Sequence, residues 1–305
     1  MLNFLVQGIF NGLIFSLVAL GYTLVYGVLR LINFAHSEVL MTGGFAGYFY
    51  LHYTIGNHPA PTSLAVSLFY IVTGVIVSGV AGTLVALIIE RFAYRPLRRR
   101  NAPKLAYLIS AIGASYFLLN LFGKEFGRYP EGTSQPFNDH VVTTIGGAQF
   151  TMYDFVILGA SVALMVALDF IVSRTKMGRA IRAVAQDAET ASLMGVNVNR
   201  TIGSTFALGG FMGGAAGFFV AINQGIAYGM GFKPALLAFT AAVLGGIGNV
   251  RGAMIGGVVL GIVMFTPIYW FHQPWLEEVI AFSVLVLILL FRPTGLLGER
   301  LGRSA

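Results

Sequence analysis

The chain has 305 residues, of which 56% are hydrophobic and only 10% are charged. Soluble domains carry about 25% charged residues, so this composition excludes a soluble globular domain and indicates a membrane protein. The absence of cysteine excludes disulfides, thiolate metal sites and cysteine nucleophiles. The net charge of +7 does not indicate a nucleic-acid partner, because the basic residues lie between apolar segments, as membrane topology explains.

Apolar segments long enough to cross a bilayer, about 17–25 residues each, recur along the whole chain. They must be helical, because unpaired backbone groups are too costly in a bilayer. These segments are 3–29, 62–90, 105–123, 152–173, 201–222, 228–249, 252–271 and 276–291. The segment 37–53 is shorter and rich in glycine, so it either crosses or re-enters. We predict an all-α fold, a polytopic transmembrane helical bundle of 8–9 spans that forms one domain, 1–305.

The first junction between spans is polar. Asn33, His36, Ser37 and Glu38 fall within six residues between apolar segments. One interpretation is a cytoplasmic turn with capping side chains. The other is a helix break that lines a translocation path or its inner gate, where polar groups face a cavity. One His and one Glu do not make a metal site.

The loop 124–151 is the longest one on the side opposite the basic clusters. Its end alternates β-forming residues around Gly146-Gly147, which predicts a short hairpin. We expect a surface loop that caps the helices, in preference to a docking platform for an external partner.

The loop 174–200 contains a second polar stretch. Residues 179–194 are rich in Ala and are predicted to form one helix, which ends at Gly195. Such a helix either lies on the membrane surface or acts as a coupling helix in a groove of an ATPase. The residues of this helix, apolar and charged, are Arg179, Arg182, Asp187, Ala188, Glu189, Ala191, Leu193, Met194 and Gly195.

If 37–53 crosses the membrane, the basic residues fall mostly in the loops on one side of it. Sixteen of the 19 basic residues then fall on one side, and only Lys124, Arg128 and Lys233 fall on the other. The positive side is cytoplasmic. The C-terminus is therefore expected inside and the N-terminus outside, although re-entry of 37–53 would move the N-terminus inside.

Glycine spacing predicts close helix packing, because small residues let backbones approach. The expected packing glycines are Gly209, Gly213, Gly217, Gly245, Gly246 and Gly256.

The spans show no mid-membrane series of Asp, Glu or His of the kind that relays protons, which favours a passive channel or a transporter driven by another subunit. The chain has no ATPase site, because the only Gly-Lys pair, Gly123-Lys124, is followed by Glu125 and not by Ser or Thr. We expect no catalytic residue, no metal site and no cofactor in this chain.

Four blocks in order resemble the LivH family, the shorter permease of branched-chain amino acid ABC importers. They are NFAHSE at 33–38, TKMGRAIRAVAQDAETASLMGVN at 175–197, FTAAVLGGIGNVRGAMIGGVVLG at 239–261 and RPTGLLG at 292–298. Ser37 stands where the family usually has Gly. The spacing Glu189-x-Ala191-x-x-x-Gly195 is similar to the coupling loop of importer permeases.

The resemblance implies a single permease domain in the bacterial inner (plasma) membrane, paired with a sister permease (LivM-like). It also implies two cytoplasmic ATPase subunits that hold ATP-Mg, and a periplasmic substrate-binding protein. The implied substrates are branched-chain or other hydrophobic amino acids, or, as in relatives, other amino acids, amides or urea. A proton-coupled amino-acid carrier and a passive channel are the alternatives.

Overall fold

The computed structural model describes residues 2–56, 63–127, 130–138, 140–271, 273 and 275–298. Each predicted apolar segment contains one long helix. These are α1 (Leu2–Leu29), α2 (His36–Thr54), α3 (Leu64–Ile89), α5 (Lys104–Glu125), α6 (Met152–Arg174), α9 (Val198–Gln224), α10 (Phe232–Gly245), α11 (Val250–Phe271) and α12 (Leu276–Phe291). The short helices are a π-helical turn, η1 (Glu90–Tyr94), and α4 (Arg95–Arg99), α7 (Lys176–Gln186) and α8 (Ala188–Leu193).

Within the described ranges, 6 helices are long and apolar enough to cross a membrane: α1, α3 with its continuation to Arg99, α5, α6, α9 and α11. The structure is thus a helical membrane bundle. Helix α10 has 14 residues, and at 1.5 Å per residue it covers about 21 Å, less than the roughly 30 Å of a hydrocarbon core. The total of 8–9 crossings remains a prediction.

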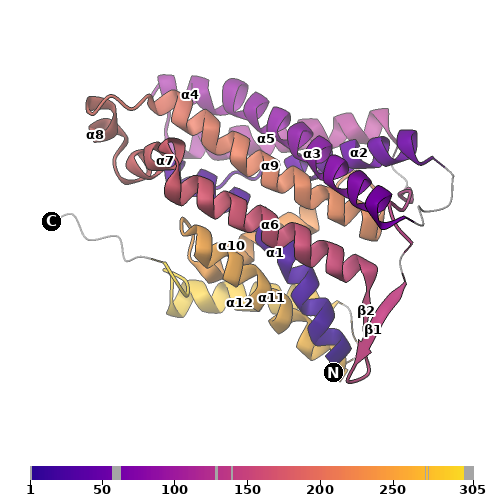
Figure 1. The fold of residues 1–305 in the computed structure, drawn as a ribbon. Coiled ribbons are helices and arrows are strands. Elements are labelled where there is room, and N and C mark those ends of the chain that lie inside the picture. Colours follow the sequence, from indigo (N-terminus) through magenta and orange to yellow (C-terminus); the bar gives the residue numbers. More distant parts are fainter. Residues whose placement is uncertain are drawn as a thin grey trace.

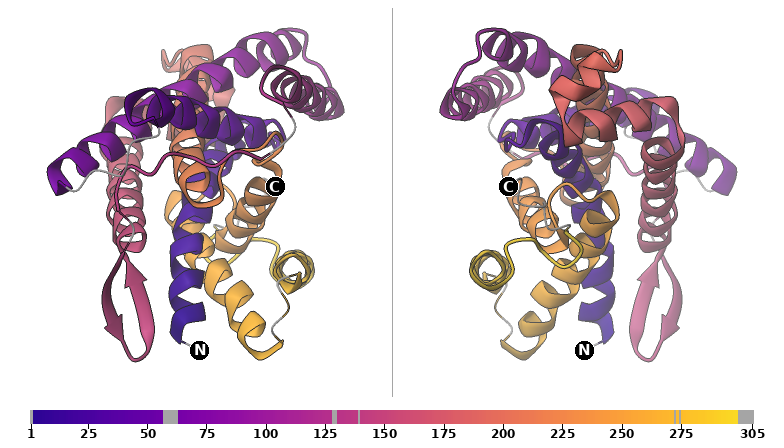
Figure 2. Two further views of the ribbon diagram at one scale, coloured as in Figure 1. Left: turned by 90° about the vertical axis from the view of Figure 1, so that its right-hand side faces the viewer. Right: turned by 90° about the vertical axis from the view of Figure 1, so that its left-hand side faces the viewer.

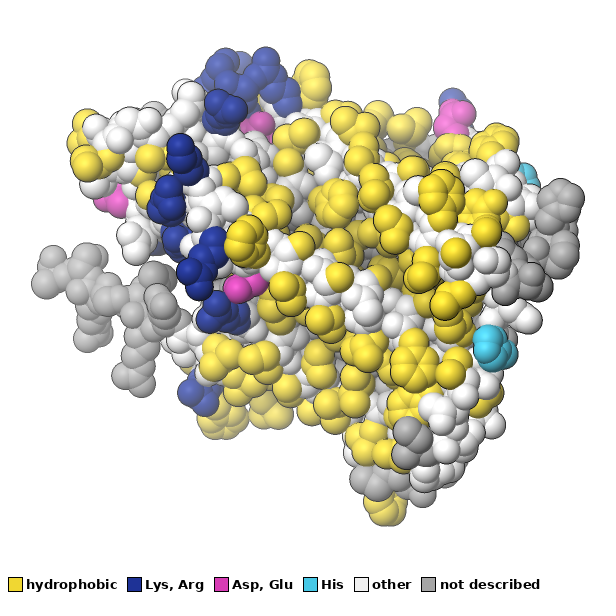
Figure 3. Space-filling view, in the orientation of Figure 1, with side chains coloured by type: hydrophobic (Ala, Val, Ile, Leu, Met, Phe, Trp, Pro, Cys, Tyr) yellow, Lys and Arg dark blue, Asp and Glu magenta, His cyan; other side chains and the backbone are white. Residues whose placement is uncertain are grey.

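The helices lie side by side, so the bundle has two ends (Figure 1). One end carries α4, α7 and α8, and we call it the basic end because Lys and Arg side chains form a band along it (Figure 3). The other carries the N-terminus and the strands β1 (Val141–Ile145) and β2 (Ala148–Thr151), and we call it the hairpin end. Arg128, Arg300 and Arg303 lie outside the described residues.

The helices α1 and α9 form the centre of the bundle and are its most buried spans. They cross at Gly21 and Gly209, where each glycine faces the backbone of the other. Helix α1 also packs on α11 through Gly8 and Gly12, and α9 packs on α3 through Gly214. A Cβ atom at these positions would meet backbone atoms of the partner helix, so the close approach depends on glycine.

A helix, a return loop and a second helix that begins inside the bundle follow one another twice, in opposite directions. Helix α1 runs toward the basic end, and α2 begins inside the bundle and returns toward the hairpin end (Figure 1). Helix α9 runs toward the hairpin end, and α10 begins inside the bundle and returns toward the basic end (Figure 1). Gly231, just before α10, contacts the backbone of Ser37 and Met41 in the first turns of α2, so α2 and α10 begin next to each other.

The strands β1 and β2 pair antiparallel, with Thr144 opposite Gln149 and Ile145 opposite Ala148. Gly146 and Gly147 connect them with φ of 58° and 82°, the positive values that a two-residue hairpin turn requires. The predicted hairpin is therefore confirmed. It lies beside the N-terminal end of α1, where the Gln149 amide donates to Asn3 at 2.9 Å (Figure 2).

The prediction of one helix over 179–194 is wrong, because the chain forms α7 and α8 with a break between them. Asp187 has extended backbone angles (φ −152°, ψ 110°), and its side chain accepts from the amides of Glu189 and Thr190 at 2.8 and 2.9 Å. An N-cap aspartate begins a new helix by satisfying free amides in its first turn. Gly195 follows α8 with φ of 84°, as its role as a stop requires.

The assignment of Gly246 as a helix-packing residue also needs correction. Gly246 lies beyond the last residue of α10, with φ of 109°, and its backbone faces Gly298 and Thr294. It is a turn residue, because only glycine adopts this conformation easily. Gly245 packs on Gly252, Gly256 packs on Ala241 and Gly245, and Gly217 packs on Leu40 and Gly44, all within this chain.

Candidate functional site

The polar junction, Asn33, His36, Ser37 and Glu38, lies inside the bundle. Each of its side chains is at most 3% exposed. After α1 ends, the chain turns back, and His36 begins α2 against Gly21 of α1 and Gly213 near the middle of α9. Glu38 accepts from Ser115, near the middle of α5, at 2.9 Å. One His and one Glu are therefore buried inside the bundle, at a junction between spans and not as a series along a span.

Hydrogen bonds join the polar junction to two other elements. Asn33 Oδ1 accepts from the Tyr94 hydroxyl of η1 at 3.2 Å and from the Ala35 amide at 3.1 Å. Glu38 Oε1 accepts from Ser37 at 3.0 Å as well as from Ser115. The junction thus links α2 with α5 and with the basic end of α3.

Two polar atoms of the junction, His36 Nε2 and Glu38 Oε2, have no hydrogen-bond partner among the described residues. The His36 ring packs edge-on against Tyr22, with 4.7 Å between the ring centroids. Buried polar atoms without partners are costly, and ionisable side chains inside a membrane bundle mark substrate or ion paths more often than packing sites. Glu38 also lies in the first turn of α2, where a carboxylate interacts favourably with the helix dipole.

Helices that begin inside a membrane protein are tolerated only where their ends are buried in protein or line a cavity. The first turns of α2 and α10 meet at Ser37 and Gly231. Discontinuous helices of this kind form the sites of many transporters. The sequence shows the polar residues of the junction but not the depth at which they lie.

The residues of the expected coupling helix are spread over two helices at the basic end. Arg182 donates to the Val172 carbonyl of α6. Ala191 is buried against its own chain, at 5% exposure, whereas Leu193 and Met194 are 83% and 81% exposed. The remaining candidates are exposed: Arg179, Asp187, Ala188, Glu189 and Gly195.

Asp187 lies outside the membrane helices. Hydrogen bonds from the backbone and then the side chain of Thr190, with a further one from the Glu189 amide, hold its pKa below the ordinary value. The cap is therefore ionised at neutral pH.

No group of three His, Asp or Glu side chains in the described parts of the chain is placed to hold a metal ion.

A cavity of about 500 Å³ opens at the hairpin end between α1, β2 and α6. Three amide side chains of α1, Asn3, Gln7 and Asn11, line it at a spacing of four residues. These amides were not among the predicted site residues, although amides at every fourth position of an apolar helix are a signal of a polar face. Further lining residues are Phe10, Gln149, Tyr153, Asp154, Ile157 and Asn223.

Buried apolar helices, two return loops and helices that begin inside the bundle define a polytopic membrane protein of the transporter class. Residues 4–289 match the family model described as branched-chain amino acid transport system / permease component. The chain belongs to this family, and the resemblance to its LivH members is confirmed.

Two relatives cover nearly the whole chain. The high-affinity branched-chain amino acid transport system permease protein LivH of Escherichia coli (strain K12) is 37% identical over 97% of this chain and 96% of the relative. The corresponding permease protein BraD of Pseudomonas aeruginosa is 36% identical over 97% and 95%. The fructose import permease protein FrcC of Rhizobium meliloti is 30% identical over 50% of this chain and 38% of its own length.

Proposed function

We propose that this chain is the membrane-spanning permease subunit of an ATP-driven importer for branched-chain or other hydrophobic amino acids in the bacterial inner membrane. The observation that carries the proposal is the identity of 36–37% to LivH and BraD over 97% of the chain. The proposed complex contains a LivM-like sister permease, two ATPase subunits that bind ATP-Mg and a periplasmic substrate-binding protein.

The proposed orientation places the basic end in the cytoplasm and the hairpin end outside. The band of Lys and Arg side chains at one end of the bundle supports this orientation (Figure 3). The N-terminus then lies outside and the C-terminus inside. The amide-lined cavity at the hairpin end opens toward the side from which a substrate-binding protein delivers its cargo.

A neutral zwitterion with an apolar side chain suits this path. The cavity at the hairpin end combines amides, which hydrogen-bond to ammonium and carboxylate groups, with apolar side chains such as Phe10 and Ile157. The cavity does not by itself select such a substrate over other amino acids, amides or urea, so the substrate class rests on the relatives.

We propose that α7 and α8 couple the permease to an ATPase. Leu193 and Met194 supply the exposed apolar contact, and the exposed charges Arg179 and Glu189 lie on α7 and α8. Ala191 does not belong to this contact surface, because it is buried within the chain.

The buried His36 and Glu38 favour one alternative, a proton-coupled carrier, because such carriers use buried ionisable groups. Uptake of labelled leucine into proteoliposomes separates the two functions. In proteoliposomes that contain all partner subunits, with the ATPases on the lumenal side, ATP in the lumen should drive uptake without a proton gradient. Uptake that follows an imposed proton gradient and ignores ATP would refute the importer. Labelled fructose and urea serve as substrate controls.

A further inference from the structure

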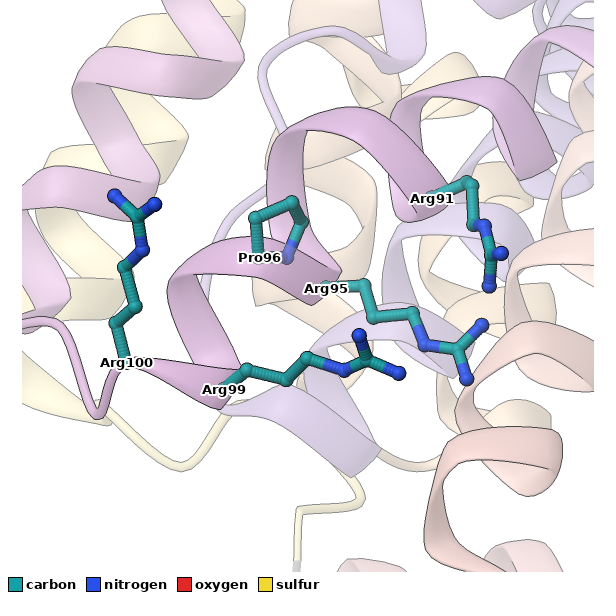
Figure 4. A pocket seen from close by; sticks show the side chains of 5 residues that line it. All are labelled: Arg91, Arg95, Pro96, Arg99 and Arg100. Atoms are coloured by element: carbon teal, nitrogen blue, oxygen red, sulfur yellow. The ribbon is translucent and has the colours of Figure 1, made fainter.

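Arginine side chains surround a cavity of about 360 Å³ at the basic end (Figure 4). Arg91, Arg95 and Arg99 follow one another at a spacing of four residues along η1 and α4, and their guanidinium groups extend to the same side. Arg100 also lines the cavity but extends from the far side of Pro96. Three cationic groups therefore converge on one space.

No described carboxylate forms an ion pair with these three arginines. The neighbouring acid, Glu90, pairs with Arg98 at 2.8 Å instead. Arg95 Nε is buried and has no hydrogen-bond partner among the residues that the structure describes. Like charges that lie side by side repel each other, so an anion in the cavity would relieve the repulsion between the three arginines.

The arginine face is firmly attached to the bundle. Tyr94, between Arg91 and Arg95, is 1% exposed, and its hydroxyl donates to Asn33 of the polar junction. Arg98 donates to Asn199, at the start of α9, at 2.8 Å. The helix that carries the three arginines is therefore held in place, and Arg guanidinium groups bind phosphate oxygens in pairs.

An apolar stripe on the same continuous helix leads to the cavity. It consists of Val80, Leu84, Ile88 and Phe92, again at a spacing of four residues. These side chains are 47%, 56%, 54% and 76% exposed. The stripe rises about 18 Å along the helix, a length that suits an acyl chain. A soluble anion or a cytoplasmic protein would not contact a stripe that extends into the membrane, whereas a lipid would.

We propose that Arg91, Arg95 and Arg99 bind the phosphate of an anionic phospholipid, whose acyl chain lies along the apolar stripe. Basic pockets at the cytoplasmic ends of membrane helices recognise anionic head groups in this way. The site requires only that the basic end faces the inner leaflet, and it is independent of the transported substrate.

The test uses the purified full chain in a neutral detergent, with native mass spectrometry to measure bound phosphatidylglycerol across a lipid titration. Arg95→Gln with Arg99→Gln should weaken phosphatidylglycerol binding roughly tenfold. The matched control, Arg174→Gln with Lys176→Gln, removes the same charge at exposed positions outside the cavity and should leave binding within about twofold. Unchanged binding in the first pair, or an equal loss in the control, overturns the proposal.

Two further arms identify the ligand. Ile88→Ala with Phe92→Ala should weaken phosphatidylglycerol binding severalfold, and inorganic phosphate at the same concentration should not displace the lipid. Displacement by phosphate, with no effect of the stripe variant, would assign the cavity to a soluble anion and refute the lipid. Normal lipid binding in the glutamine pair, combined with loss of ATPase co-purification, would assign the arginines to a protein partner. If the glutamine pair fails to give a monodisperse protein, Arg99→Gln alone replaces it.

Discussion

At the residue scale, the placement of His36 depends on two glycines. A Cβ atom at Gly21 of α1 would overlap the His36 ring, and a Cβ atom at Gly213 of α9 would crowd it from the other helix. The imidazole is 2% exposed and packs on Tyr22. The central crossing of α1 and α9 therefore exists in its present form because it accommodates this ring.

Gly21→Ala should destabilise the bundle by about 1–3 kcal/mol, the usual cost of overpacking a core, because His36 must move. Thermal unfolding of the purified protein in detergent measures the effect. Gly113→Ala is the control, since no atom lies within 4 Å of the added Cβ at this exposed helical position, and it should not lower stability because Ala is the better helix former. Equal stability of both variants would contradict the role of Gly21.

Removing the titratable groups of the polar junction distinguishes the two possible energy sources, ATP hydrolysis and a proton gradient. His36→Gln and Glu38→Gln keep hydrogen-bonding side chains in place but remove titration. In an ATP-driven importer both variants should retain ATP-dependent leucine uptake within a few fold, measured in proteoliposomes. Loss of uptake in assembled complexes, with ATPase activity intact, would show that protonation is required.

At the element scale, α7 and α8 together decide which residues of the loop 174–200 present a surface. Helix α7 buries Ile181 and Val184, and α8 buries Ala191 and leaves Leu193 and Met194 exposed. Bulky substitution of Ala191 would therefore test the folding of this chain and not its contact with a partner.

Leu193→Ser with Met194→Ser should reduce coupled transport by about tenfold, because an exposed apolar contact with the ATPase is lost. The measurement is uptake and ATPase activity in the reconstituted complex. Ser192→Ala, on the same helix but without a change in apolar contact, is the control. Coupled uptake at the wild-type level in the double variant would remove α8 from the coupling contact.

The N-cap of α8, Asp187, should stabilise the helix less at low pH. Because the pKa of Asp187 is lowered in the folded state, its stabilisation is complete above the ordinary Asp pKa of about 3.9 and is lost as the pH falls through the folded pKa. Hydrogen exchange of residues 188–193, corrected for intrinsic rates, should show weaker protection at low pH. Asp187→Asn should remove this dependence and keep the cap, whereas Asp187→Ala should lose protection at every pH.

At the scale of the whole molecule, the two ends of the bundle differ in charge, and the two sets of helices run in opposite directions. Two ion pairs join different helices. Arg251 of α11 lies 3.1 Å from Asp169 of α6, and Lys233 of α10 lies 3.1 Å from Glu277 of α12. Helix α5, in contrast, is mostly exposed and offers its surface to lipid or to the proposed sister permease.

Orientation can be tested with a single introduced thiol, because the native chain has no cysteine. Ser192→Cys, at the basic end, should resist an impermeant thiol reagent in intact cells and react after permeabilisation. Thr144→Cys, in the hairpin, should react in intact cells. The reverse pattern would invert the proposed topology.

The class of protein, the positions of the long helices and the hairpin were all accessible from the sequence. Each depends on a local property, either the hydropathy of about 20 successive residues or the turn chemistry of Gly146 and Gly147. The break at Asp187 was accessible too, since aspartate is a strong N-cap, but the Ala-rich surroundings favoured one continuous helix.

Only the tertiary structure decided the depth of the polar junction, the meeting of α2 with α10 and the convergence of Arg91, Arg95 and Arg99 on one cavity. His36 and Glu38 appear between two apolar segments in the sequence, as a surface turn would. They lie inside the bundle because the chain turns back after α1 and packs on α9, more than 150 residues away. Hydropathy reports which segments enter the bilayer, but contacts between distant helices determine how far each one enters.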